Sequence, residues 1–247
     1  MGVEVCLPTR WELHLPMSIC APNRTGYVFS GHIFMTRPGR QQELLEEVQK
    51  AQSYGISTIC DPTVMGLGRD IHFMENIVEQ TGIQLVAATG LYTYHDIPHF
   101  FENRSIDFMS DLFVHDIEEG IQGSDTRAGI IKFATDEPGI TPAIQKVISA
   151  GARAHRRTGV PIITHSHAHN GSGAEQQRLL EAEGVDLRRV VIGHAGDTDD
   201  IEYLVQLLER GSFIGLDRYQ TRSKAPHFSA GDKGARREAN VLFFLNR

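Results

Sequence analysis

The chain lacks the features of several protein classes. It has three cysteines among 247 residues, and Cys6, Cys20 and Cys60 have neither metal-binding nor redox spacing. No apolar run approaches the ~20 residues needed to span a bilayer, and the first residues lack the basic start and apolar core of a signal peptide. The formal charge of −7, without a basic stripe, argues against nucleic acid as a partner. We therefore expect a cytoplasmic protein that binds neither membrane nor nucleic acid.

Motifs of several enzyme classes are also missing. No Gly-x-Ser-x-Gly elbow occurs, which leaves a serine hydrolase unsupported. Gly66-Leu-Gly68 lacks the third glycine of a dinucleotide fingerprint. A glycosidase needs two carboxylates at strand ends; Asp61 and Asp217 qualify formally, but no glutamate does.

What the chain does contain is a regular alternation of short apolar runs and helical patterns. The runs are apolar on both faces, as buried parallel strands are. Expected strands cover 27–34, 56–64, 84–91, 128–134, 160–165, 189–194 and 212–217. Expected helices cover 40–53, 70–81, 105–122, 141–158, 173–183 and 198–210, with Asp70, Ser105, Thr141 and Thr198 as N-cap candidates. This order predicts one domain over 1–247, an α/β barrel or a doubly wound sheet.

Three polar side chains close apolar runs in the middle of the chain: Lys132, His165 and His194. Burying such groups is costly unless they are paired or needed. In a parallel barrel they would converge at the C-terminal mouth, where barrel enzymes hold their chemistry. Lys132 alone fits an ion pair with Asp136 or Glu137, a Schiff-base nucleophile, or a carbamylated bridge between metals. The two histidines favour the metal interpretation.

Other histidines are weaker candidates. His32 lies near the end of the first expected strand and is a fourth ligand candidate, although a loop histidine there is equally plausible. His167 and His169 follow His165 at a spacing that suits a metal clip, but we expect them in a solvent-exposed loop.

Several longer motifs resemble the phosphotriesterase family of the amidohydrolase superfamily, and especially its phosphotriesterase-like lactonases. The resemblance covers about residues 27–219. The matching stretches are TICDPTVMGLGRD (58–70), ATGLYTY (88–94), AGIIKFATDEPG (128–139), ITHSHAHN (163–170), VIGHAGD (191–197) and FIGLDRY (213–219).

The resemblance implies a TIM-type (β/α)8 barrel with two divalent metals, of zinc, cobalt, iron or manganese, at its mouth. By this resemblance Lys132 is carboxylated, bridges both metals and counts as a catalytic residue. His165 and His194 would bind the more exposed metal and His32 the buried one. A hydroxide between the metals would attack the ester carbonyl or phosphorus.

The resemblance also implies a substrate class. Tyr92 and Arg218 match positions that line the lactonase pocket, with Tyr94 assisting. The implied substrates are lactones, including the acyl-homoserine lactones whose hydrolysis is quorum quenching, with organophosphate triesters as side substrates.

The chain departs from the family pattern at both ends of the barrel. Ser30 stands where the first strand of the family carries a histidine ligand, and no aspartate matches the one on the eighth strand. We therefore expect a barrel without strand 8 and a divergent tail over residues 220–247. Dimerisation or local rearrangement would cover the exposed sheet edges.

Two alternatives to an active two-metal hydrolase follow. One is a catalytically impaired, truncated barrel that binds one metal or none, since losing a ligand and the acid–base group together should slow turnover by orders of magnitude. The other is a barrel aldolase that uses Lys132 as a Schiff base.

Overall fold

A curved sheet of parallel strands forms the centre of the computed structural model, which describes residues 40–217 and 244–245. The strands follow one another across the sheet in chain order, and the first six are parallel. They are β1 (Thr58–Asp61), β2 (Gln84–Leu91), β3 (Ala128–Ala134), β4 (Ile162–His165), β5 (Val190–Ile192) and β6 (Phe213–Gly215). These strands match six of the seven expected ones; the expected strand at 27–34 lies outside the described residues.

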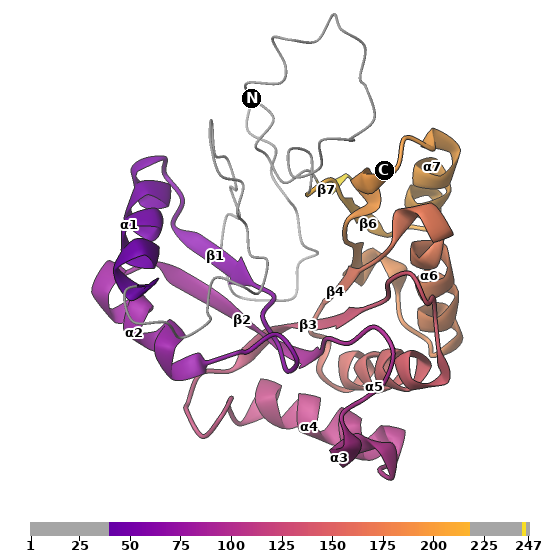
Figure 1. The fold of residues 1–247 in the computed structure, drawn as a ribbon, viewed down its shortest axis with the longest axis horizontal. Helices are drawn as coiled ribbons and strands as arrows, with labels where there is room; N and C mark the ends of the chain where they lie inside the picture. The colour runs from indigo at the N-terminus through magenta and orange to yellow at the C-terminus, as the bar shows by residue number, and fades with distance from the viewer. Residues whose placement is uncertain (1–39, 218–243, 246–247) are drawn as a thin grey trace, which may run out of the picture.

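The helices lie on the outer side of the sheet (Figure 1) and alternate with the strands as predicted. They are α1 (Arg40–Ser53), α2 (Ile71–Thr81), α3 (His99–Glu102), α4 (Ile106–Glu118), α5 (Pro142–Thr158), α6 (Ser172–Ala182) and α7 (Ile201–Glu209). Short 3-10 turns occupy Ala168–Asn170, Leu187–Arg189 and Ala195–Asp197. None of these helices is long and apolar enough to cross a membrane.

Local signals set most helix starts. Asp70, Ser105 and Thr141 each accept a hydrogen bond from the backbone N–H three residues later, which satisfies a donor that the first turn leaves unpaired. The fourth expected cap is wrong. Asp200, and not Thr198, accepts from the N–H of Tyr203, so the last helix begins later than expected.

The main core lies between the outer face of the sheet and the helices. Large buried side chains such as Phe113, Phe133 and Ile148 pack there, while a second cluster lies under α1 and α2. A smaller cluster combines Val64, which follows β1, with Ala88 of β2 and Ile130 of β3, and Cys60 packs against it. Apolar packing on both faces explains why the strands have no alternating pattern.

Three other elements differ from expectation. The helix expected over 105–122 ends at Glu118, because Gly120 has a φ of 144° and a side chain there would collide with the carbonyl of Ser124. The four-residue α3 was missed, being too short for a helical period. The strand β7 (Phe244–Leu245) pairs antiparallel with β6, so the sheet does not end on a parallel strand.

Candidate active site

Lys132 lies near the C-terminal end of β3 with a buried side chain, 5% exposed. Its Nζ donates a hydrogen bond to the carbonyl oxygen of Thr164 on β4 at 2.9 Å. The neighbouring strand approaches closely because Gly90 has no side chain: a Cβ there would lie 1.9 Å from the Lys132 carbonyl oxygen, and the φ of Gly90 is 127°. The fold thus places an amine in the interior at the end of the sheet where the histidines also lie.

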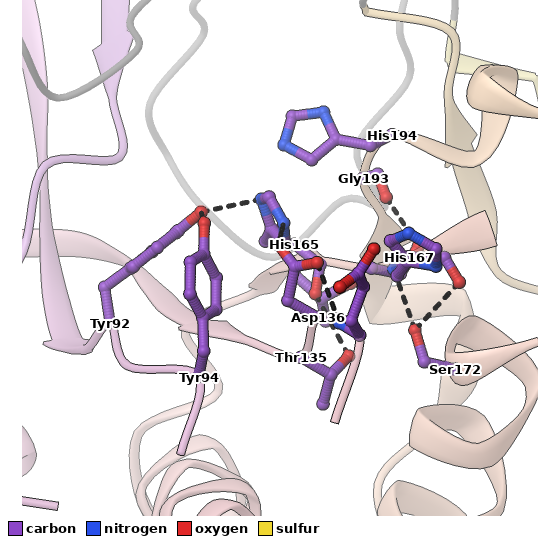
Figure 2. A network of polar contacts seen from close by, with 12 residues as sticks. Tyr92, Tyr94, Thr135, Asp136, His165, His167, Ser172, Gly193 and His194 are labelled. Atoms are coloured by element: carbon purple, nitrogen blue, oxygen red, sulfur yellow. Dashed lines mark hydrogen bonds and ion pairs between the residues drawn. The ribbon is translucent and has the colours of Figure 1, made fainter. Parts of the chain in front are cut away.

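His165 is the last residue of β4 and is held at both ring nitrogens (Figure 2). Its Nε2 donates to Asp136 Oδ2 at 3.1 Å, and its Nδ1 lies 2.8 Å from the hydroxyl oxygen of Tyr92. Because a carboxylate can only accept, Asp136 places the proton of a neutral ring on Nε2 and the lone pair on Nδ1. The tautomer of His165 is therefore set by Asp136.

The Asp136 carboxyl has other partners that keep it charged. Burial alone would raise its pKa, but the Glu137 N–H and the His165 ring hold the pKa below the ordinary value. The sequence suggests Asp136 only as an ion-pair partner for Lys132. In the structure its Oδ1 accepts from the Glu137 N–H and its Oδ2 from the His165 ring.

His194 lies two residues beyond β5 in a left-handed conformation, with φ 60° and ψ 18°. This is an uncommon conformation for a residue other than glycine. Its Nδ1 donates to Asp217 Oδ1 at 2.7 Å, and its backbone N–H is 3.4 Å from Oδ2 of the same carboxylate. The lone pair of a neutral His194 ring is therefore on Nε2. The preceding Gly193 allows close approach to β4, since a Cβ would lie 2.2 Å from the Thr164 carbonyl oxygen.

Asp217, two residues past β6, is the most strongly perturbed acid at the site. Burial would raise its pKa, but the His194 hydrogen bond and charge, with a contribution from Lys132, lower the pKa to about 2. Lys132 and His194 thus share the electrostatic environment of one carboxylate.

The structure brings together three of the four predicted ligands. The rings of His165 and His194 lie edge to face with centroids 4.5 Å apart, and Lys132 lies on the strand beside His165. The other predicted ligand, His32, and the predicted pocket residue Arg218 lie outside the described residues. Within residues 40–217 and 244–245, no group of three or more His, Cys, Asp or Glu side chains is arranged to hold a metal. Among the described residues, Lys132 is the predicted ligand that could add a third donor to the two histidines.

The donor set nevertheless fits a divalent transition metal. Two imidazoles, each with its other nitrogen fixed by a carboxylate, form the arrangement in which histidine ligands are usually oriented. Imidazole suits zinc, iron and related ions. The described residues thus fit one metal, with Lys132 as an added donor if it is carboxylated.

The two predicted tyrosines lie beside these histidines (Figure 2). The hydroxyl oxygens of Tyr92 and Tyr94 are 2.7 Å apart, and their ring centroids are 5.3 and 5.6 Å from that of His165. His169 is exposed as expected, whereas His167 is half-buried with its backbone N–H bonded to Ser172. The loop after β4 is therefore held by a hydrogen bond to α6 that the sequence does not reveal.

Sequence reasoning missed the roles of Asp136 and Asp217. Each lies two residues past the end of a strand, and that position is the one signal in the sequence that points to them. Asp61 is the last residue of β1 and is fully buried, but its Oδ1 accepts from Thr63 in the loop that follows, and burial raises its pKa.

Comparison with known proteins decides the family. The model of the phosphotriesterase family matches residues 37–244. The chain belongs to the phosphotriesterase family. An aryldialkylphosphatase of Saccharolobus solfataricus is 60% identical over 175 residues, which are 71% of this chain and 56% of that protein. A phosphotriesterase homology protein of Escherichia coli is 35% identical over 74% of this chain and 63% of its own length.

A solved structure of the same family supports the fold. The phosphotriesterase from Mycobacterium tuberculosis is 45% identical, with a TM-score of 0.70 over 73% of this chain and 58% of that one. The expected TIM-type barrel fold is confirmed for β1 to β6. The chain spans between half and two thirds of the length of these phosphotriesterase relatives.

Proposed function

We propose that the chain is a metal-dependent hydrolase that cleaves lactones, including acyl-homoserine lactones, and organophosphate triesters. The observation that carries this proposal is the pairing of His165 and His194, whose rings are 4.5 Å apart and are each oriented by an aspartate. An arrangement in which a carboxylate fixes one ring nitrogen and the other nitrogen takes the ligand is typical of metal-binding histidines. At His165 the metal would replace the Tyr92 hydroxyl, which lies 2.8 Å from Nδ1.

The metals of this proposal are zinc, cobalt, iron or manganese. His165 and His194 would hold the first ion, and Lys132 would join them after carboxylation turned its amine into an anionic oxygen donor. His32 would serve a second ion. Bound divalent metals lower the pKa of water and polarise the carbonyl or phosphoryl oxygen of a substrate.

The protein groups around the histidines would orient the substrate. Tyr92 offers a hydroxyl next to His165, and Tyr94 fixes that hydroxyl from its other side. A donor held in place before the substrate arrives stabilises developing negative charge without reorganisation. We assign Tyr92, Tyr94 and Arg218 to substrate binding, and Asp136 and Asp217 to holding the histidine tautomers.

The proposal is tested by elemental analysis of the purified chain loaded with zinc, cobalt or manganese, beside lactone and paraoxon hydrolysis. We expect bound metal and turnover in the wild type and loss of both in His165→Ala and His194→Ala. His169→Ala is the control, because His169 is exposed in the same loop. A wild-type chain that binds no metal in excess metal would overturn the proposal.

An impaired barrel is the second candidate, favoured by one observation: the described residues offer two imidazoles and one lysine, enough for a single ion. It predicts weak binding of one metal or none without turnover, and Ser30→His should not restore activity unless an eighth strand is also supplied. The aldolase alternative requires a free Lys132 amine, and borohydride trapping with a carbonyl substrate would detect its Schiff base.

The proposed partner is a small molecule, in keeping with the net charge of −7. A cytoplasmic homodimer is the proposed state, and sedimentation of the purified chain would measure its mass.

A further inference from the structure

Gln176 on α6 forms hydrogen bonds to residues at the C-terminal ends of β3 and β4, the two strands that carry Lys132 and His165. The side chain is completely buried, and its Nε2 donates to Thr135 Oγ1 at 2.5 Å and to the His165 carbonyl oxygen at 2.8 Å. A carbonyl can only accept, so chemistry fixes which end of the amide faces His165. The amide nitrogen therefore donates to Thr135, which follows β3, and to His165, which ends β4.

The two bonded residues are next to the groups that meet at the site. Thr135 immediately precedes Asp136, whose carboxylate holds the His165 ring (Figure 2). Thr135 also donates its backbone N–H to the His165 carbonyl at 2.9 Å. One buried amide thus fixes the backbone of His165 relative to the backbone that carries Asp136.

We propose that Gln176 is a positioning residue that keeps the Asp136 carboxylate aligned with Nε2 of His165. The inference rests on the proposed function, because it concerns the ring that would bind metal. Gln176 lies outside the mouth and touches neither Tyr92 nor His194 in the hydrogen bonds described; it acts through His165. Removing its amide would let the ends of β3 and β4 shift, and a small shift breaks a 3.1 Å hydrogen bond.

The two ends of the Gln176 amide differ in their contacts. Its Oε1 is buried without a hydrogen-bond partner within the described part of the chain. A buried polar atom without a partner is unfavourable, and an apolar side chain of similar size would avoid it. The favourable contacts of this amide are therefore the two hydrogen bonds of its nitrogen, to Thr135 and His165.

The next residue supplies a matched control. Gln177 is equally buried, also leaves Oε1 without a partner among the described residues, and donates Nε2 to the Leu207 carbonyl of α7 at 2.9 Å. Gln176→Met and Gln177→Met therefore remove the same chemistry from one helix, but only the first removes it from the site.

The test measures two properties of both variants. In the metal-free proteins, long-range 15N–1H NMR of the His165 ring, assigned by its loss in His165→Gln, reports the tautomer. Titration with Co2+ reports affinity. We expect Gln177→Met to match the wild type in both, and Gln176→Met to move the His165 ring nitrogen shifts and weaken Co2+ binding about 10-fold, the low end for partners that orient a ligand.

The outcomes separate this inference from the proposed function. A wild type that binds no Co2+ overturns the proposed function, while the metal-free NMR comparison still decides the role of Gln176. Ring shifts and affinity that are the same in both methionine variants overturn the inference. If Gln176→Met does not fold, Thr135→Val removes one of the two acceptors together with the 3.3 Å bond from Thr135 Oγ1 to the His165 carbonyl oxygen. A change of the His165 ring shifts of the same sign supports the inference, and an unchanged His165 ring overturns it.

Discussion

The imidazole of His165 meets that of His194 edge to face, with ring centroids 4.5 Å apart and an interplanar angle of 78°. The two residues come from neighbouring parallel strands and are 29 positions apart in the chain. Each ring is turned by a different carboxylate, Asp136 for His165 and Asp217 for His194. The orientation of the pair is therefore a property of four side chains.

Asp217→Asn should weaken metal binding. The asparagine retains an acceptor oxygen for His194 Nδ1 but loses the charge, and changes of such partners cost about 10–100-fold in metal affinity. Titration with Zn2+ against a chromogenic chelator measures the effect. Asp199→Asn, at an exposed position nearby, is the control and should bind as the wild type does. Equal affinities in the two variants would show that Asp217 does not orient a ligand.

The buried ion pair of Arg69 with Asp116 should matter for stability. Arg69 Nη1 donates to Asp116 Oδ2 at 2.8 Å and to the Ala88 carbonyl at 2.9 Å, and the side chains are 6% and 9% exposed. Arg69→Met leaves a carboxylate buried without its cation, which costs about 3–5 kcal/mol of unfolding free energy. Urea denaturation measures the loss.

An exposed ion pair gives the comparison for Arg69. Arg178 and Glu175 pair on α6 with side chains 65% and 44% exposed. Arg178→Met should cost less than about 1 kcal/mol, because water screens such pairs. Similar losses in the two methionine variants would mean that the buried pair is not specially stabilising.

His155 should make the protein less stable in mild acid. The ring is buried near the end of α5, and its Nδ1 lies 2.8 Å from the Val160 carbonyl oxygen, to which it donates. Burial lowers the pKa of His155 below 6.5, against a smaller raising effect of that hydrogen bond. Below pH 6.5 the unfolded chain therefore binds more protons at this residue than the native chain, and stability falls as pH falls.

His155→Gln should remove that contribution. The free energy of unfolding, measured in urea at pH 7.5 and 5.5, should fall less with acid in His155→Gln than in the wild type, by up to about 1.4 kcal/mol per pH unit. His155→Phe, which also lacks a titrating ring, should reduce the acid dependence in the same way as His155→Gln. A slope that His155→Gln does not alter would exclude this residue as the cause.

The Cys60 thiol should react slowly in the native protein. Burial, with the charge of Asp61, raises its pKa to about 12 despite an opposing effect of Lys132. At pH 8 far less of this thiol is then ionised than the roughly one quarter expected for an ordinary cysteine of pKa ~8.5. Alkylation by iodoacetamide, followed at the Cys60 peptide by mass spectrometry, should be slow in buffer and fast in concentrated urea. Equal rates would contradict a raised pKa of the Cys60 thiol in the native protein.

Local features of the sequence predicted most of the fold. Asp70, Ser105 and Thr141 cap helices as expected because capping involves residues only three positions apart. The alternation of apolar runs with helical patterns also predicted the six parallel strands. Thr198 and Asp200 are both cap-forming residues close to one helix start, and the sequence does not say which one makes the bond.

The site was less predictable because its contacts are long-range. Lys132, His165 and His194 were found from their positions at strand ends, and parallel strands bring such ends together. The partners of the histidines were not found. Asp136 is 29 residues from His165 and Asp217 is 23 from His194, so those pairings depend on the register of the sheet and the shape of two loops. The antiparallel β7 likewise depends on where a distant segment docks.

The tight contact of Gly90 with the Lys132 carbonyl limits how this fold can be re-engineered. Any larger residue at position 90 would push β2 away from β3, and the amine of Lys132 would move with its strand. Variant libraries can change exposed side chains in the loops after the strands, such as that of Glu137. Selection for folded variants should return glycine at position 90.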